Sequence, residues 1–237
     1  MTLALTAEQA FERYEAAFNQ DLLIQGSWHL DQDGRQLACA LGVLDENVNG
    51  AADCPASVMP RWLARMVPWF FDRMEFGDAR QWGREFYAEL KRLNGDVPFT
   101  VVYDWHASVV TPLAIEVSEM RKRDPEPHRK LQALHLRALA GDRATREEWR
   151  AILKDADADA YADADAYADA YADAYADADA YADAYAYAYA YAYAYADADA
   201  YADADAYADA ATRRERMKRI AFGMVECLRR VPTPAAA

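Results

Sequence analysis

The chain has 237 residues, a formal net charge of −14 and 54% hydrophobic residues. This length is sufficient for one domain or two small ones with a substantial core. A strongly negative net charge favours binding of cations or basic partners and disfavours binding of nucleic acid and anionic membranes. The chain has no apolar run long enough to span a membrane and no basic N-terminal region typical of a signal peptide, so we expect a cytoplasmic protein.

The first fifty residues combine one clear helix start with a turn-rich stretch. Thr6 and Gln9 have the spacing of a capping box, which predicts a helix that begins after Thr6. Residues 25–50 are rich in Gly, Asn and Asp, which favour turns. Within them the apolar run over residues 36–44 is too short to assign by its pattern, and a buried helix is one option for it.

Two helices are predicted between residues 57 and 95. Ser57 is expected to cap the first, with Pro60 in its first turn. Asp78 is expected to cap the second, and the pair Asn94–Gly95 is expected to stop it.

Residues 96–123 have conflicting local signals. The stretch Phe99–Tyr103 has strand propensity, but apolar residues recur every three or four positions for eighteen residues. The longer pattern predicts a helix that is bent or broken near Pro112. Another helix is predicted to follow and to end at Gly141.

A second capping box, Thr145–Glu148, predicts a helix that leads directly into a low-complexity repeat. From Asp155 to Ala210 every even-numbered residue is Ala, and the odd-numbered positions hold 15 Asp and 13 Tyr. The repeat has no basic residue, so the rest of the chain has a net charge of +1.

The repeat is compatible with more than one backbone conformation. In a strand, all Ala side chains would share one face. In a helix, Asp and Tyr over residues 165–185 fall on opposite halves of the helical wheel. The high helix propensity of Ala favours the helix, with strand and disorder as the alternatives.

The helical wheel defines two candidate binding faces. The Tyr face comprises Tyr167, Tyr171, Tyr175, Tyr181 and Tyr185, and the Asp face comprises Asp165, Asp169, Asp173 and Asp177. The Tyr face is either core or a recognition surface for a protein. Stacking on nucleic acid requires accompanying positive charge, so we expect no direct nucleic-acid binding.

A basic helix over residues 212–231 follows the repeat, with seven basic and two acidic residues. A single helix over residues 145–230 would be about 130 Å long, so we expect the segment to fold back as a hairpin with the basic helix along the Asp face. The predicted fold class is all-α. It comprises a multi-helix core domain over residues 1–143, the repeat with the basic helix over residues 144–231, and a tail over residues 232–237.

Candidate catalytic and metal-binding residues are few. Asp104 and His106 have the composition of an acid/base pair, but residues two apart do not face each other on a helix. His128 and His135 share a helical face, as two metal ligands would, and we expect them to be surface histidines. Because no phosphate-binding loop or nucleophile elbow is present, we predict no catalytic residue, no metal and no cofactor.

The segments on either side of the repeat resemble a known group of proteins. LQALHLRALAGDRATREEWRA and TRRERMKRIAFGMVECLRR enclose an Ala-rich block with regular Tyr and Asp, and DCPASVMPRWLARMVPWFFD lies upstream. This order resembles Ala-rich helical proteins of bacteria and phages, some described as immunity proteins. It covers under half of the chain outside the repeat, and the strict alternation departs from the looser block of that group. The resemblance implies a helical layout and a role in bacterial conflict, and no catalytic residue.

We therefore expect a non-enzymatic module that binds a protein partner, as an immunity or anti-defence factor. One alternative is an acidic DNA mimic that occupies the basic cleft of a nucleic-acid-binding protein. Another is an enzyme that uses Asp104, His106 or His29. A third is an oligomerisation or filament scaffold, in which the chain forms a homo-oligomer.

Overall fold

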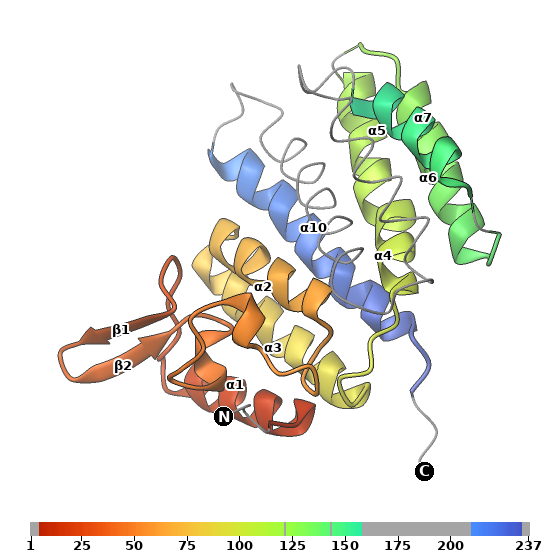
Figure 1. Cartoon of the computed structure of the whole chain (residues 1–237). Helices are drawn as coiled ribbons and strands as arrows, with labels where there is room; N and C mark the ends of the chain where they lie inside the picture. The colour runs from red at the N-terminus through yellow and green to blue at the C-terminus, as the bar shows by residue number, and fades with distance from the viewer. Residues whose placement is uncertain (1–4, 121, 143, 158–209, 234–237) are drawn as a thin grey trace. The chain divides into compact units, whose positions relative to one another are not determined.

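The computed structural model describes residues 5–120, 122–142, 144–157 and 210–233 (Figure 1). These residues are mainly helical, as the sequence predicts, and they include one two-stranded sheet. None of the helices in this part of the chain is long and apolar enough to cross a membrane.

The chain divides into two compact units. Unit 1 comprises Met1–Pro98 and Arg214–Ala237, and unit 2 comprises Phe99–Arg213. The domain boundary expected after residue 143 falls within unit 2. Unit 1 is therefore built from two pieces of chain that are far apart in sequence.

Unit 1 contains four helices and a hairpin among its described residues. In chain order these are α1 (Ala7–Asn19), β1 (His29–Gln32), β2 (Arg35–Ala38), α2 (Arg61–Arg73), α3 (Phe76–Arg92) and α10 (Ala210–Arg230), which belongs to the unit from Arg214 onward. The capping box before α1 is confirmed. The Gln9 amide donates to Thr6 Oγ1 at 3.2 Å, and the Thr6 amide donates to Gln9 Oε1 at 3.0 Å.

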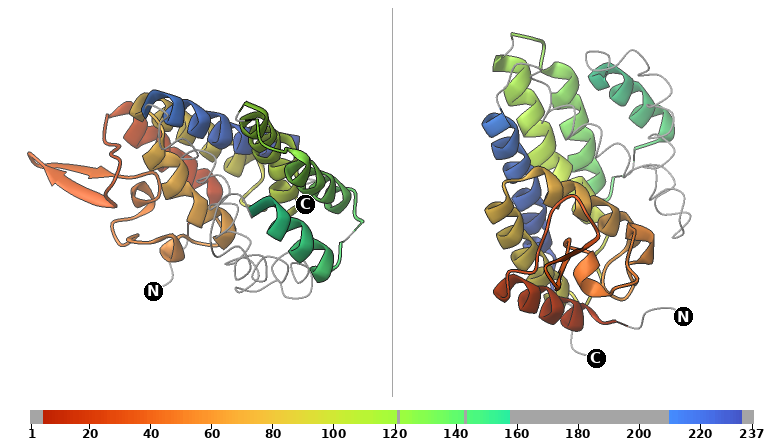
Figure 2. Two further views of the ribbon diagram at one scale, coloured as in Figure 1. Left: turned by 90° about the horizontal axis from the view of Figure 1, so that it is seen from above. Right: turned by 90° about the vertical axis from the view of Figure 1, so that its left-hand side faces the viewer.

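No α-helix forms within residues 36–44, because the first part of that run is strand β2. β2 pairs antiparallel with β1, and the hairpin projects from the helices of unit 1 (Figures 1 and 2). The turn residues Asp33 and Gly34 have φ of 54° and 76°. An Asp-Gly turn with both φ positive is strongly preferred in two-residue hairpins, and it outweighs the apolar run. Only Gly42–Leu44 forms a 3₁₀ turn.

The expected caps of α2 and α3 are also wrong. Ser57 lies upstream of α2, and its hydroxyl donates to the Leu5 carbonyl oxygen at 2.6 Å. Asp78 lies in the first turn of α3 rather than before it. A carboxylate there still interacts favourably with the positive end of the helix dipole. The predicted stop after α3 is confirmed, since Asn94 and Gly95 both have positive φ.

The core of unit 1 is aromatic. It includes Tyr14, Phe70, Phe71, Trp82, Phe86 and Tyr87, all fully buried. Helix α1 packs against α3 at Gly83, where an added Cβ would lie 2.1 Å from the Tyr14 Oη. Glycine at this position thus permits the close approach of the two helices.

Unit 2 contains α4 (Thr100–Trp105), a π-helical turn (His106–Val110), α5 (Thr111–Met120), α6 (Glu126–Leu139) and α7 (Arg146–Asp157). The helix predicted within residues 96–123 is confirmed from Thr100 to Met120, and the expected irregularity near Pro112 is the π-helical turn. The amide and the hydroxyl of Thr111 both donate to the His106 carbonyl oxygen, the hydroxyl at 2.8 Å. Pro112 has no amide and its ring crowds the carbonyl four residues earlier, so a widened turn just before it relieves that conflict.

Helix α7 begins as predicted. The Glu148 amide donates to Thr145 Oγ1 at 3.2 Å, and the Thr145 amide donates to Glu148 Oε2 at 2.8 Å. Helix α6 ends before Gly141, which has φ of 83°. The buried apolar residues between α6 and α7 are Leu131, Leu134, Ala138, Trp149 and Leu153.

Candidate functional site

The residues predicted as binding faces of the repeat lie outside the described residues. These are Tyr167, Tyr171, Tyr175, Tyr181 and Tyr185 on one face and Asp165, Asp169, Asp173 and Asp177 on the other. The predicted hairpin lies there too. The structure does describe the two helices that flank the repeat, α7 before it and α10 after it.

A stacked pair of histidines lies in the interior of unit 2. His106 is on the π-helical turn and His135 is on α6, with ring centroids 4.5 Å apart and ring planes 13° apart. Each is only 1% exposed, and His128 is also buried. The prediction that His128 and His135 are surface histidines was therefore wrong. Both lie on α6, which packs against α4, the π-helical turn, α5 and α7.

Aromatic side chains from two elements, α4 and α7, lie around this pair. Trp105 of α4 meets the ring of His106 edge-on at 5.1 Å, and Trp149 of α7 meets His135 at 5.0 Å. Tyr103 stacks on Trp149 at 6.4 Å and lies 6.2 Å from His135. We call Tyr103, Trp105, His106, His135 and Trp149 the histidine–aromatic cluster.

Burial keeps both histidines uncharged. It lowers the pKa of His106 to about 3. The pKa of His135 is also far below its usual value, first because of burial and second because of His106. Among the described residues, neither ring nitrogen of His106 has a hydrogen-bond partner. His106 is therefore held by ring packing at neutral pH, and a buried charge there would be costly.

The cluster has limited chemical capacity. His106 stacks on His135, and burial, not the carboxylate of Asp104, accounts for its lowered pKa. No group of three or more His, Cys, Asp or Glu side chains in the described part of the chain has the arrangement of a metal site. His29, the remaining histidine, has its Nε2 2.9 Å from the Val48 carbonyl oxygen in unit 1.

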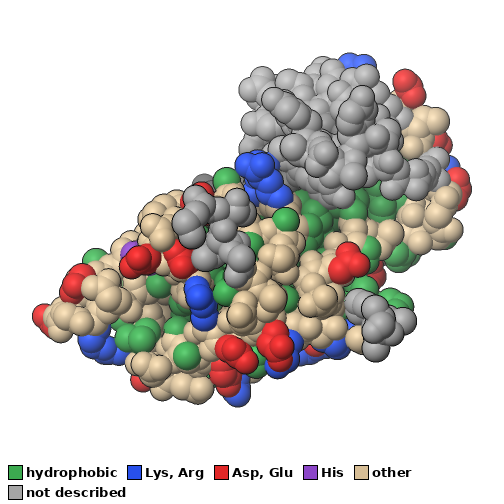
Figure 3. Space-filling model, turned by 60° about the horizontal axis from the view of Figure 1, so that its bottom comes forward, with side chains coloured by type: hydrophobic (Ala, Val, Ile, Leu, Met, Phe, Trp, Pro, Cys, Tyr) green, Lys and Arg blue, Asp and Glu red, His purple; other side chains and the backbone are tan. Residues whose placement is uncertain are grey.

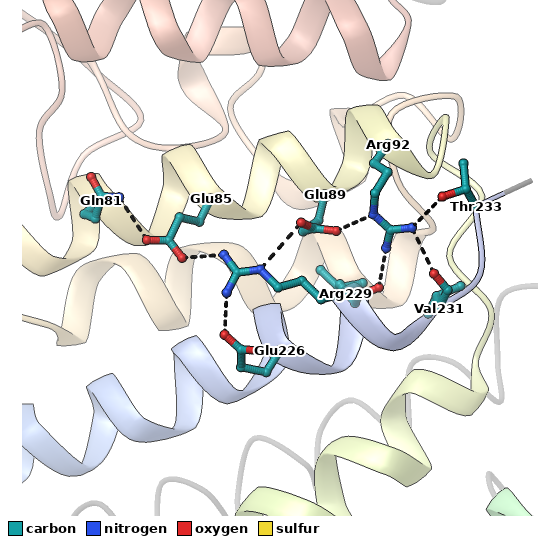
Figure 4. A network of polar contacts seen from close by, with 9 residues as sticks. Gln81, Glu85, Glu89, Arg92, Glu226, Arg229, Val231 and Thr233 are labelled. Carbon is teal, nitrogen blue, oxygen red and sulfur yellow. Dashed lines mark hydrogen bonds and ion pairs between the residues drawn. The ribbon is translucent and has the colours of Figure 1, made fainter.

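A network of charged side chains connects α3 with α10 in unit 1 (Figure 4). Arg229 lies at its centre, with Nη2 2.7 Å from Glu85 Oε2 and Nε 3.6 Å from Glu89 Oε1. Arg229 also bonds Glu226 on its own helix. We call these residues, together with Arg92, the α3–α10 charge network.

Arg92 of α3 holds the last turn of α10. Its Nε donates to Glu89 at 2.6 Å, while its two terminal nitrogens donate to the Leu228 and Val231 carbonyl oxygens at 2.6 and 2.9 Å. Thr233 Oγ1 accepts a further bond at 3.1 Å. The Leu228 carbonyl oxygen also accepts the Val231 amide at 3.0 Å, so Arg92 adds a second donor there and binds the Val231 carbonyl oxygen just beyond the helix end.

Other basic residues of α10 also pair within unit 1. Lys218 lies 2.9 Å from Asp78, and Arg214 lies 2.9 Å from Glu75. Sequence reasoning placed the basic helix along the Asp face and did not foresee these pairs. The available signal was the spacing of Asp78, Glu85 and Glu89, which puts three carboxylates on one face of α3.

The remaining surface charge is mixed in sign. On the face drawn in Figure 3, acidic and basic side chains lie interspersed. Comparisons of the chain with protein-family models, with curated proteins and with solved structures found no match.

Proposed function

We propose that this protein is a non-enzymatic binding module that offers the repeat of residues 155–210 to a protein partner. The observation that supports it most is the anchoring of both flanking helices. Trp149 and Leu153 of α7 are buried in unit 2, and Met217, Ile220 and Met224 of α10 are buried in unit 1. A segment tied at both ends to folded units loses less freedom when it binds than a free tail does.

The described flanks also favour a helical repeat. Helix α7 continues through Asp157, so it includes the first three repeat residues, and α10 begins at Ala210, the last one. We therefore propose that the repeat is helical and folded back as a hairpin. Its Tyr face and its Asp face would then be separate recognition surfaces.

Charge suggests the chemistry of the partner. The repeat has 15 aspartates and no basic residue. Arg214, Lys218 and Arg229, which follow it, pair with acidic residues of unit 1. A basic protein surface would therefore complement the repeat, and such complementarity chiefly increases the rate and specificity of association.

Two refinements follow from the same acidity. Regularly spaced aspartates could replace DNA phosphates in a basic cleft, which would make the protein a DNA mimic. The resemblance of the flanking segments to bacterial and phage immunity proteins favours a role as an immunity or anti-defence factor. In either case the partner is a protein with a basic binding surface.

The test compares partner capture by three full-length proteins. The first variant removes the charge of the Asp face by Asp→Asn changes at Asp165, Asp169, Asp173 and Asp177. The matched control removes four exposed acids of unit 1, with Glu12→Gln, Asp33→Asn, Glu46→Gln and Asp96→Asn. We expect capture to be lost in the first variant, kept in the control and weakened by salt.

Other outcomes distinguish the alternatives. Competition by duplex DNA for the captured partner would identify a DNA mimic. Capture that survives the Asp changes but is lost when Tyr167, Tyr171 and Tyr175 are changed to Ser would indicate apolar docking. Self-association on sedimentation with no captured partner would contradict the proposal and favour an oligomerisation scaffold.

A further inference from the structure

The stacked histidine pair lies where three elements of unit 2 meet. Its two rings come from the π-helical turn and from α6, and Trp149 brings α7 into contact with His135. We propose that the pair His106–His135 is a proton-sensitive joint that holds α7 against α6 at neutral pH and releases it in acid. The ligand of this site is the proton.

The geometry of the pair makes it sensitive to charge. The rings are parallel within 13° and their centroids are 4.5 Å apart, so a charge on one lies directly against the other. Both side chains are 1% exposed, which means that a protonated ring cannot be hydrated without opening the packing. Trp149 is the contact through which that opening reaches α7.

Burial and the neighbouring histidine account for the lowered pKa values of the pair. The ionisable side chains on the packed elements include Tyr103 and Asp104 on α4, Glu116 and Glu119 on α5, His128 and Arg137 on α6, and Glu147, Glu148 and Arg150 on α7. Glu148 pairs with Arg137 and Glu119 pairs with Arg129, both at the exposed surface. The pKa of His106 is lowered by burial, and that of His135 by burial and by His106.

The direction of the pH effect follows from linkage. A histidine whose pKa is lower in the folded state than in the unfolded state contributes its full stability above about pH 6.5. The contribution to stability decreases as the pH drops below this value. For His106 the decrease continues down to about pH 3. His106 touches α7 only through His135, so its effect applies to an opening that hydrates both rings. Between about pH 7 and pH 5, His106 alone should raise the equilibrium constant for that opening roughly 20- to 30-fold. His135 acts in the same direction.

Release of α7 would alter one anchor of the repeat. Helix α7 carries Asp155–Asp157, the first repeat residues, whereas α10 packs with α3 in unit 1. Acid should then loosen the first anchor and leave the second in place. This consequence rests on the proposed function, while the joint itself can be tested without any partner.

The test is amide hydrogen exchange of the full-length chain at about pH 7 and pH 5, corrected for the intrinsic effect of pH on exchange. We expect protection of α7 to fall at least about 20-fold at the lower pH, while α3 keeps its corrected protection. The double variant His106→Phe/His135→Phe should lose this response. The control His29→Gln, which removes a histidine of unit 1, should keep it.

Two results would overturn the proposal. One is equal protection of α7 at both pH values in the unchanged protein. The other is an undiminished response in the double variant. If that variant does not fold, imidazole NMR of the unchanged protein decides, because titration of His106 or His135 in the folded state near pH 6.5 also overturns the proposal.

Discussion

Three buried rings of unit 1 and the buried ring of His106 in unit 2 accommodate their polar atoms differently. In unit 1, Tyr14 donates to the Arg80 carbonyl oxygen, Tyr87 to that of Ala40 and Trp82 Nε1 to that of Ala221. In unit 2, the described residues provide no hydrogen-bond partner for either ring nitrogen of His106.

This difference has consequences for specificity and for pH response. Burial raises the pKa of both Tyr14 and Tyr87, so their hydroxyls remain protonated donors at ordinary pH. A satisfied donor also fixes which backbone group it faces. Tyr14, Trp82 and Tyr87 of unit 1 are thus oriented by directional bonds, whereas His106 of unit 2 is held by ring packing that a proton can disturb.

The largest expected effect tests the directional bonds of unit 1. Trp82→Ala removes a fully buried indole and its 3.0 Å bond to Ala221 on α10. We expect the free energy of unfolding of unit 1 to fall by about 3–5 kcal/mol, measured by denaturant titration. A loss below about 1 kcal/mol would mean that α10 does not depend on this contact.

A second variant tests how closely α1 and α3 must approach. Gly83→Ala places a methyl group 2.1 Å from the Tyr14 Oη, and we expect a loss of about 1–3 kcal/mol. The matched control is Gly77→Ala, also in α3, where nothing lies within 4 Å. Thermal melts of both variants separate the clash from the effect of helix propensity. Higher helix propensity alone would stabilise both variants, whereas the clash would destabilise only Gly83→Ala.

A third change probes the π-helical turn of unit 2. Thr111→Val keeps the shape of a buried side chain but removes the hydroxyl bond to the His106 carbonyl oxygen. That oxygen still accepts the amide of residue 111, so we expect a loss of only about 0.5–1.5 kcal/mol. An unchanged unfolding free energy would show that the backbone bond alone maintains the turn.

The smallest expected effect concerns the α3–α10 charge network. Arg229 is 40% exposed at its side chain, so solvent screens its ion pairs with Glu85 and Glu89. Arg229→Ala should lower stability by about 1 kcal/mol or less, and the difference should shrink at high salt. Arg61→Ala on α2 serves as the exposed control, and an equal effect there would argue against a specific network.

Local signals predicted much of the helical layout. The capping boxes at Thr6 and Thr145 and the stop at Gly141 depend only on neighbouring residues, and the structure confirms them. The hairpin was missed because the Asp33–Gly34 turn was given less weight than the apolar run beside it. Both signals were present in the sequence, and the more local one was decisive.

Long-range arrangements were not accessible in the same way. The burial of His128 and His135 depends on which face of α6 the other elements cover. The seven-residue spacing of the two histidines does not predict which face that is. The pairing of α10 with α3 joins residues more than a hundred positions apart. The predicted Tyr and Asp faces stay predictions, since they lie outside the described residues.

The bond between Trp82 and Ala221 spans 139 residues, which constrains the order of events during synthesis. At about 5–20 residues per second, α10 leaves the ribosome roughly 7 to 28 seconds after α3. Most of unit 2 is synthesised between α3 and α10. It can therefore begin to fold before α10 is available to cover the apolar face of α3. A ribosome that stalls before residue 210 would therefore release a chain with unit 2 able to fold and an exposed half-core, a substrate for chaperones.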